Sequence, residues 1–328
     1  MRPSTSDSIE PDGNDSASDL NSDDSSNIDT ASLISDVRRY HFENGRRYHA
    51  YQAGKYLWPN DEEEQTRLDL FHHIHLLLLD GALYLAPIDS EPRHVLDVGT
   101  GTGIWALEFA YQYPNADIIG VDLSPIQPSW APANCNFIVD DVELNWSYGY
   151  LKFDFIHVRG MVGCIADYGR LYQQAFDHLT PGGWIEVVEF ETLIRNNEPC
   201  DESRMRHTNM WLEYIDQATS SIDKPVRVAA DQRQHLIDAG FEGVTESVYR
   251  LPFGTWPKDP KLKEIGRYQL AQMLQAVDSA SPAIFTRILG WDTARLERLT
   301  TAVKKEFLDG SLHLFCNLHF VYGRKPTT

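Results

Sequence analysis

One stretch of this chain limits its possible folds more than any other: residues 95–106 read VLDVGTGTGIWA. A short apolar run ends in a loop that holds Gly99, Gly101 and Gly103, and a helical pattern then continues to Pro114. Glycines permit a tight turn and let backbone N–H groups approach a ligand closely, and the first turn of a helix favours negative charge. The stretch therefore predicts a strand, a binding loop and a helix.

The spacing of these glycines separates two classes of nucleotide-binding fold. The dinucleotide fingerprint is G-x-G-x-x-G, and its third glycine would fall at position 104, which is Ile104 here. The chain has G-x-G-x-G instead. An NAD-dependent oxidoreductase is therefore disfavoured, although a glycine loop alone indicates only a nucleotide-like ligand.

Acidic residues stand at the ends of three successive predicted strands. Asp97 precedes the loop, Asp122 ends the next strand, and Asp141 follows the strand after that. Any one of them alone is most simply a solvated loop carboxylate. Together they lie at the carboxyl edge of one parallel sheet, where open α/β sheets bind ligands. Asp97 can orient the loop, Asp122 can accept hydrogen bonds from both ribose hydroxyls, and Asp141 can accept one from an adenine amine.

Residues 93–191 alternate between strand and helix patterns, which is typical of βαβ crossovers and a parallel sheet. The later patterns predict helices near 201–221 and 230–240, a strand near 241–254, mostly helix over 259–308, and a final strand near 312–325. We expect the last two strands to complete a seven-stranded sheet, with the final one antiparallel. Helices near 201–230 and 259–308 would then be insertions on one face.

Composition divides the chain into three parts. Residues 1–36 hold ten serines and nine acidic residues with almost no large apolar side chains, which predicts a disordered tail. Residues 37–92 are rich in tyrosine and arginine and read as a helix over 61–80, which Asn60 or Asp61 can cap, so we expect a helical cap. Residues 93–328 carry the α/β pattern.

Several classes of function are excluded by composition and spacing. The formal net charge of −19 repels a phosphate backbone, so we expect no nucleic-acid partner. The four cysteines are scattered, without the spacing of a zinc site or a disulfide framework. Neighbouring His72, His73 and His75 lack metal-ligand spacing, so we interpret them as surface or packing residues and expect no metal.

Location is indicated only weakly. The N-terminus has no apolar signal region, and no apolar run is long enough to span a bilayer, so we expect no membrane partner. Scattered cysteines fit a reducing compartment. We therefore expect a cytoplasmic protein, and the basic pairs Arg38-Arg39 and Lys304-Lys305, which make a weak import signal, leave the nucleus open.

Together these residues resemble a known family, the class I S-adenosylmethionine-dependent methyltransferases, and more narrowly the fungal LaeA-like group. The stretches that carry the resemblance are YHAY (48–51), PNDE (59–62), VLDVGTGTGIWA (95–106), GVDLSPIQPSW (120–130), DDVE (140–143), FDFIHVR (153–159), LTPGGWIEVVE (179–189) and FVYGRKP (320–326). The resemblance implies a Rossmann-like seven-stranded sheet in the order 3-2-1-4-5-7-6, with strand 7 antiparallel. It also implies S-adenosyl-L-methionine as the cofactor.

The resemblance further implies where this cofactor is bound. The positions matched to cofactor contacts are Asp97, Gly99, Thr100, Gly101, Gly103, Asp122, Leu123, Asp141 and Val142. Leu123 and Val142 would lie on either side of the adenine ring, and Asp97 would reach the cofactor's ammonium group through water. Arg159 would contact the methionine portion. Its carboxylate would be bound by Arg47, Tyr48 and Tyr51; alternatively, these three only pack the cap over the sheet.

Two functions are compatible with these features. The first is methylation of a small-molecule secondary metabolite by in-line transfer. The second is a LaeA-like regulator of secondary metabolism that acts through protein partners. A base is needed only when the acceptor is protonated, and the catalytic residues stay unassigned among His157, Glu189, Glu191 and His207.

The acceptor pocket is expected between the cap and the two helical insertions. These insertions contain large apolar residues, namely Met205, Met210, Trp211, Tyr214, Met273 and Trp291. Such residues can line a pocket for an apolar small molecule. They can equally form ordinary core, and core is the interpretation we favour.

Overall fold

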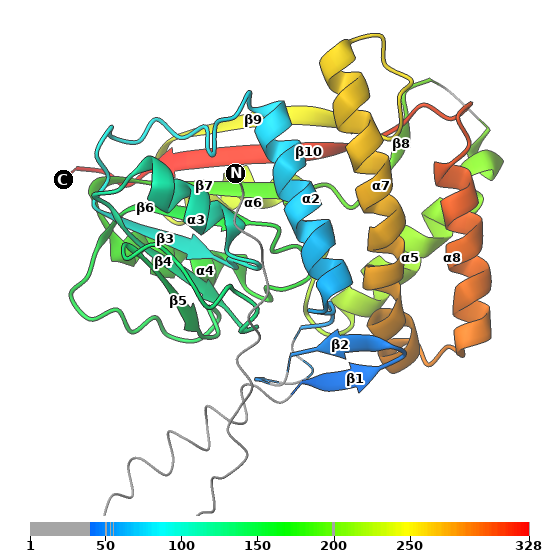
Figure 1. Cartoon of the computed structure of the whole chain (residues 1–328), viewed down its shortest axis with the longest axis horizontal. Coiled ribbons are helices and arrows are strands. Elements are labelled where there is room, and N and C mark those ends of the chain that lie inside the picture. The colour runs from blue at the N-terminus through cyan, green and yellow to red at the C-terminus, as the bar shows by residue number, and fades with distance from the viewer. Residues whose placement is uncertain (1–39, 50, 53, 55, 199–200, 328) are drawn as a thin grey trace, which may run out of the picture.

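A mixed β-sheet crosses the molecule (Figure 1). The computed structural model describes residues 40–49, 51–52, 54, 56–198 and 201–327, so the predicted tail lies outside the described residues. The strands of the sheet are β3 (His94–Val98), β4 (Asp117–Asp122), β5 (Cys135–Val139), β6 (Phe153–Arg159), β7 (Leu179–Phe190), β8 (Arg195–Asn196), β9 (Glu242–Pro252) and β10 (Leu314–Arg324).

The strand order confirms the predicted topology. Neighbouring strands follow the order β5-β4-β3-β6-β7-β10, and β9 also pairs with β10. When the strands are renumbered along the chain from β3 as strand 1, with β9 as strand 6 and β10 as strand 7, this order is 3-2-1-4-5-7-6. The strands from β3 to β7 pair in parallel, and β10 is antiparallel to both β7 and β9. The two-residue strand β8, which pairs with the start of β10, is an addition to the predicted set.

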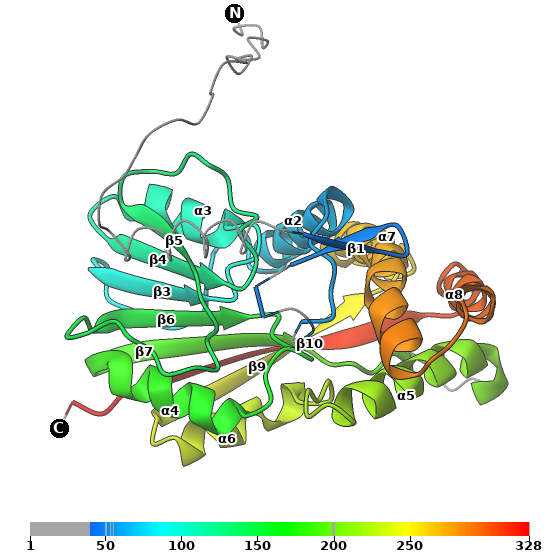
Figure 2. The same ribbon diagram turned by 90° about the horizontal axis from the view of Figure 1, so that it is seen from below.

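Helices cover both faces of this sheet. They are α2 (Glu62–Leu78), α3 (Ile104–Gln112), α4 (Tyr168–His178), α5 (Arg206–Ser220), α6 (Gln232–Asp238), α7 (Pro260–Ala283) and α8 (Thr293–Phe307), with short 3-10 turns at Glu202–Met205 and Ala229–Asp231 and a π-helical turn at Ile284–Ile288. Helices α2 and α3 lie on one side, and α4 and α6 lie on the other (Figure 2). Helices α7 and α8 stand beyond the carboxyl ends of the parallel strands (Figure 2), which places the second insertion beside the expected site.

The segment 37–92 contains a β-hairpin as well as the expected helix. Strands β1 (His41–Glu43) and β2 (Arg46–Tyr48) pair antiparallel. Asn44 and Gly45 form the turn with φ of 50° and 75°. The prediction of a helical cap is therefore incomplete. Asn-Gly is a strong signal for a two-residue hairpin turn, so the sequence did contain the information.

Helix α2 joins this hairpin to the sheet. Its N-cap is Asp61, whose side chain accepts a hydrogen bond from the backbone N–H of Glu64, as a capping residue does. Phe71, Ile74 and Leu78 are buried along one stripe of the helix, because residues three and four apart share a face. Packing of this stripe fixes α2 over the sheet.

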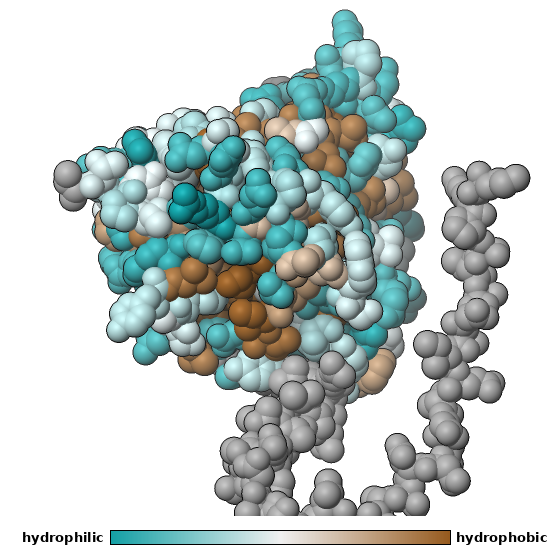
Figure 3. All heavy atoms as spheres, turned by 60° about the vertical axis from the view of Figure 1, so that its left-hand side comes forward, coloured by the Kyte–Doolittle hydropathy of each residue, from teal (hydrophilic) through white to brown (hydrophobic). Residues whose placement is uncertain are grey.

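The core fills both faces of the central strands. Leu96 of β3 and Ile156 of β6 belong to the core on one face, Val95 and Phe155 belong to the core on the other, and all four are completely buried, as expected for strands covered by helices on both sides. The outer face shown in Figure 3 is mostly hydrophilic, with apolar areas between the polar ones. Among the described residues, no helix has the length and apolar character needed to cross a membrane.

Candidate active site

The glycine-rich loop lies between β3 and α3, as predicted. Gly99, Gly101 and Gly103 have φ of 70°, 57° and 81°, in the left-handed region that disfavours side chains. Neighbouring side chains add a second requirement. A Cβ at Gly103 would lie 2.6 Å from the Phe137 ring, and a Cβ at Gly99 would overlap the Met161 sulfur. The loop therefore requires glycine for both its conformation and its close packing.

Asp97 supports this loop from the protein interior. One carboxylate oxygen accepts a hydrogen bond from Thr100 Oγ1 at 2.6 Å, and the other accepts one from His157 Nδ1 at 2.8 Å. The His157 ring stacks on Trp105 with centroids 3.8 Å apart. Burial lowers the pKa of His157, although its bond to Asp97 opposes this shift. His157 is therefore a packed, neutral histidine that helps to orient Asp97.

The Asp122 carboxylate joins the end of β4 to the same loop. It accepts hydrogen bonds from the backbone N–H groups of Gly101 and Ser124, both at 2.9 Å. Burial raises the pKa of Asp122, and the two N–H groups act in the opposite direction. A carboxylate has four lone-pair sites, so Asp122 can accept further hydrogen bonds from a ligand.

A cleft with about 980 Å³ of empty space, including space open to solvent, lies at the carboxyl edge of these strands. Eight of the twelve residues expected at the cofactor line it, namely Gly99, Thr100, Gly101, Asp122, Leu123, Asp141, Val142 and Arg159. The structure thus brings the ends of β3, β4, β5 and β6 to one site.

The other four expected residues, Asp97, Gly103, Tyr48 and Tyr51, are absent from the lining of the cleft. Gly103 precedes α3 as its N-cap. Tyr48 is 2% exposed and lies beneath the Arg287 guanidinium, 4.4 Å from its ring centre. Tyr48 ends strand β2 of the hairpin, and its side chain is buried in the cap. This position of Tyr48 agrees with the interpretation in which it packs the cap and does not bind the cofactor carboxylate.

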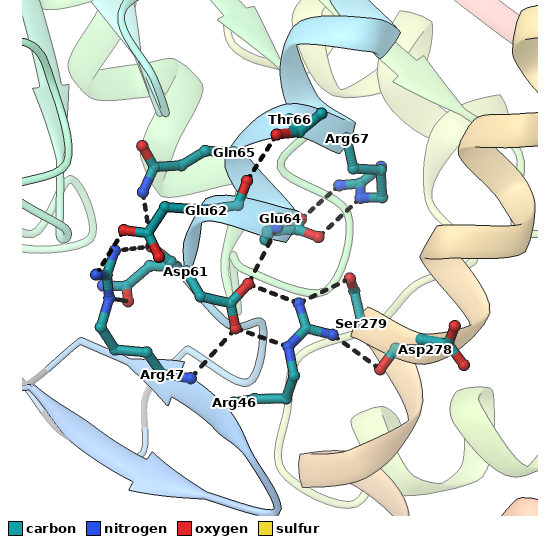
Figure 4. Close-up of polar contacts among 11 residues, drawn as sticks. Arg46, Arg47, Asp61, Glu62, Glu64, Gln65, Thr66, Arg67, Asp278 and Ser279 are labelled. Carbon is teal, nitrogen blue, oxygen red and sulfur yellow. Dashed lines mark hydrogen bonds and ion pairs between the residues drawn. The ribbon is translucent and has the colours of Figure 1, made fainter.

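Arg47, the third residue considered for the cofactor carboxylate, is also held within the cap (Figure 4). Its guanidinium donates to the Asn60 carbonyl at 2.6 Å and to the Glu62 carboxylate at 2.9 Å. It does not line the cleft. Tyr56, a few residues farther along, does line it, and the irregular chain after β2 carried no sequence signal for that orientation.

Arg159 brings a positive charge to the cleft. It follows directly from the end of β6, and its side chain lines the cleft. No hydrogen bond or ion pair joins its guanidinium to another residue in the part of the chain that the structure describes. Burial lowers the pKa of Arg159, but a guanidinium stays protonated in proteins. Arg159 is half-buried, and the Asp97, Glu108 and Glu186 carboxylates act on its charge only from a distance. A partly desolvated cation without a direct hydrogen bond or ion pair is unfavourable, so the site favours an anionic ligand group here.

His72 is a packing residue, as one of our two interpretations had it, but it also lines the cleft. It is 2% exposed, and its Nε2 lies 3.1 Å from a Glu108 carboxylate oxygen. Burial lowers the pKa of His72 to about 2, so the ring is neutral. Leu68, Phe71 and His72 share one face of α2, and this helical spacing was the signal that could have identified it.

A second cavity, with about 910 Å³ of empty space, adjoins the first. Both cavities are lined by Tyr56, Leu68, Phe71 and Gly160. The second cavity extends between α2, α5 and α7, where we expected the acceptor pocket. Most of its walls are apolar, and they include Trp58, Phe190, Trp211, Leu212, Ile215 and Met273.

The large apolar residues of the insertions belong to the core or pack against it. Trp211 and Met273 line the second cavity. Tyr214 and Trp291 instead pack edge to face at 4.8 Å, and Phe285 lies 4.9 Å from the Trp291 ring. Met205 and Met210 do not line either cavity. Met205, Trp211 and Met273 belong to the buried core, and Met210, Tyr214 and Trp291 pack against it. The preference for core thus agrees with the packing of these residues, and Trp211 and Met273 line the cavity in addition.

Of the four candidate bases, Glu191 is the one that lines a cavity, and this is the second cavity. Burial acts to raise its pKa, but Arg195, His319 and Asn317 together outweigh this effect, and the pKa is lowered. Glu189 is completely buried and accepts a hydrogen bond from the Met161 backbone N–H at 2.8 Å. His207 lies 2.7 Å from Glu306. None of these arrangements identifies a catalytic base.

Comparison with known proteins agrees with this geometry. The model of the methyltransferase domain family matches residues 70–245. The methyltransferase pytC of Aspergillus terreus is 40% identical and is covered over 91% of its length by 90% of this chain. The secondary metabolism regulator LAE1 of Cochliobolus heterostrophus is 36% identical, with 87% of this chain and 95% of that protein covered. The protein-methionine methyltransferase laeA of Emericella nidulans is 36% identical, with 89% and 78% covered.

The chain therefore belongs to the S-adenosylmethionine-dependent methyltransferases, in the fungal LaeA-like group. Its cofactor is S-adenosyl-L-methionine, and the fold is that of the class I enzymes. An NAD-dependent oxidoreductase is excluded by this membership, in agreement with the glycine spacing.

Proposed function

We propose that S-adenosyl-L-methionine binds in the cleft with its adenosine near Asp122 and Asp141 and its methionine portion near Arg159. The Arg159 guanidinium supports this orientation, because it makes no hydrogen bond or ion pair with the described residues and the methionine carboxylate is the anionic group of the ligand. The fixed Asp122 carboxylate can accept from the ribose hydroxyls. Leu123 and Val142 offer apolar side chains for the adenine ring.

The bound cofactor supplies a methyl group on a sulfonium, a reactive centre whose leaving group is neutral. The task of the chain is then chiefly to hold two reactants in line and to exclude water from between them. Tyr56, Leu68, Phe71 and Gly160 are shared by the two cavities. We infer that the transferred methyl group passes beside these residues.

We further propose that the acceptor is a small molecule bound in the second cavity, a secondary metabolite. The observation that carries this proposal is the continuity of a largely apolar cavity with the cofactor cleft through shared lining residues. Ligand pockets are typically apolar with a few polar groups. The 40% identity to a protein described as the methyltransferase pytC also supports enzymatic methylation.

A second candidate function is regulation of secondary metabolism through protein partners. It is favoured by relatives that are described as secondary metabolism regulators and as a protein-methionine methyltransferase, each 36% identical to this chain. A cytoplasmic location accompanies the first candidate, and a nuclear location accompanies the second.

Metabolite profiling of three fungal strains separates the two functions. The strains carry the wild-type gene, no copy, or the Asp122→Ala variant. We expect one compound to lose a single CH2 unit of mass in both mutant strains, because methylation of one acceptor is lost. Broad loss of many unrelated compounds would contradict the small-molecule proposal and favour the regulator.

A further inference from the structure

Two buried amide oxygens line the second cavity without a partner. Gln269 and Gln272 are 1% and 4% exposed, and both contribute to the wall of this cavity. Their Oε1 atoms are buried and accept no hydrogen bond from any of the described residues. The residues are three positions apart on α7, so their side chains lie on the same face of the helix.

Packing alone does not account for these glutamines. A buried acceptor that lacks a partner destabilises a protein, whereas the neighbouring Met273 lines the same wall with an apolar side chain of similar length. Gln269 Nε2 donates to Cys316 Sγ at 3.5 Å, which orients the amide and leaves its oxygen unsatisfied. The two oxygens therefore indicate a ligand that brings hydrogen-bond donors into the cavity.

Charges around the cavity are already compensated. Glu64 and Arg67 form a two-point ion pair, with N–O distances of 2.6 and 2.8 Å, and Glu191 is paired with Arg195. Burial raises the pKa of the Cys316 thiol to about 12, so this group is uncharged. An acceptor with a net charge would be buried without a counter-ion, which is strongly unfavourable. The cavity suits a neutral molecule.

We propose that Gln269 and Gln272 determine which acceptor is methylated, by accepting hydrogen bonds from hydroxyl or N–H groups of a neutral, largely apolar small molecule. This inference rests on the proposed role of the second cavity as the acceptor site. Neither glutamine lines the cofactor cleft. The donors that they bind are therefore remote from the atom that receives the methyl group, and the two residues act on specificity.

Pairs of aromatic fragments that differ in one donor group test this inference. Naphthol is compared with fluoronaphthalene, and indole with benzofuran, by ligand-observed NMR titration of the full chain saturated with S-adenosylhomocysteine. We expect the member with the donor to bind about tenfold more tightly, the effect of one satisfied buried hydrogen bond. In the Gln269→Met, Gln272→Met double variant, we expect both members to bind with similar affinity.

Gln275→Met is the matched control, because Gln275 is exposed on the same helix; this variant should keep the preference for donors. Calorimetric titration with S-adenosylhomocysteine checks that every variant retains its cofactor site. Equal binding of both members by the wild type, or a preference that survives in the double variant, would overturn the inference while the acceptor role of the cavity stands. If neither member binds, the acceptor role itself is wrong, and the inference fails with it.

Discussion

The Asp122 carboxylate accepts a hydrogen bond from the Gly101 backbone N–H at 2.9 Å, so the end of β4 and the glycine loop form one continuous wall of the cofactor cleft. Asp97 fixes the other side of the loop through Thr100. Preorganised groups of this kind bind a ligand without having to be ordered at the moment of binding. The affinity for the cofactor should therefore depend on a small number of side chains.

Replacing Arg159 with glutamine should weaken binding of S-adenosyl-L-methionine by about ten- to one-hundredfold, because a hydrogen bond to a charged group contributes roughly 1.5–3 kcal/mol. Calorimetric titration measures this difference. Decarboxylated S-adenosylmethionine provides the internal control, since it lacks the group that Arg159 is proposed to bind and should lose little affinity. Arg233→Gln, at an exposed position on α6, should leave both affinities unchanged. Equal losses for the two ligands would contradict the assignment.

The buried carboxyl group of Glu189 should make stability depend on pH. Burial raises its pKa from 4.5 to about 8, so the folded protein prefers the protonated form. The contribution of this group to stability is complete below about pH 4.5, and it is lost as the pH rises towards 8. In the wild type, this group should make the free energy of unfolding fall by up to about 1.4 kcal/mol for each pH unit between these two values. In Glu189→Gln, this part of the pH dependence should be absent.

Urea denaturation at several pH values measures the slope for Glu189→Gln. The glutamine amide oxygen can still accept the hydrogen bond from the Met161 backbone N–H. Glu297→Gln serves as the control because Glu297 is exposed on α8; its slope should match that of the wild type. An identical slope in Glu189→Gln and the wild type would show that Glu189 is ionised normally in the folded protein.

Arg46 and Asp61 clamp the hairpin to two helices (Figure 4). Their two-point ion pair has N–O distances of 2.7 and 2.8 Å, and Arg46 also donates to Ser279 Oγ on α7 at 3.3 Å. Asp61→Ala should lower the free energy of unfolding by about 3–5 kcal/mol, because it leaves a largely buried cation without its partner. Urea denaturation tests this value.

A matched control is the exposed pair of Lys261 and Asp80, which lie 2.7 Å apart. Asp80→Ala should cost less than about 1 kcal/mol, as is usual for exposed ion pairs. If the two alanine variants have similar stability, the Arg46–Asp61 pair does not hold the cap in place.

The sheet could be predicted from the sequence because local patterns determine it. Alternating strands and helices, glycines at the turn after β3, and acids at successive strand ends are all features of short segments. The structure adds that Asp97 faces inward, towards Thr100 and His157. The sequence spacing does not distinguish an acid that contacts the ligand from one that supports the loop behind it.

The second cavity could not be predicted in comparable detail. Its walls come from α2, α5, α7 and the end of β7, which are far apart in the chain. Whether Trp211 faces the cavity or the core depends on how these helices pack, as does the orientation of Tyr56. Gln269 and Gln272 carry no special pattern in the sequence. Only their buried amide oxygens, which have no hydrogen-bond partner among the described residues, indicate a role.

Calorimetric titration of the wild type and Asp122→Ala with S-adenosyl-L-methionine and with NAD tests the cofactor assignment most directly. Asp117→Ala, at the exposed start of the same strand, is the control. We predict that the wild type binds S-adenosyl-L-methionine saturably and does not bind NAD. The affinity for S-adenosyl-L-methionine should fall at least about tenfold in Asp122→Ala and should be unchanged in Asp117→Ala. Binding of NAD without S-adenosyl-L-methionine, or an unchanged affinity in Asp122→Ala, would contradict the proposed site.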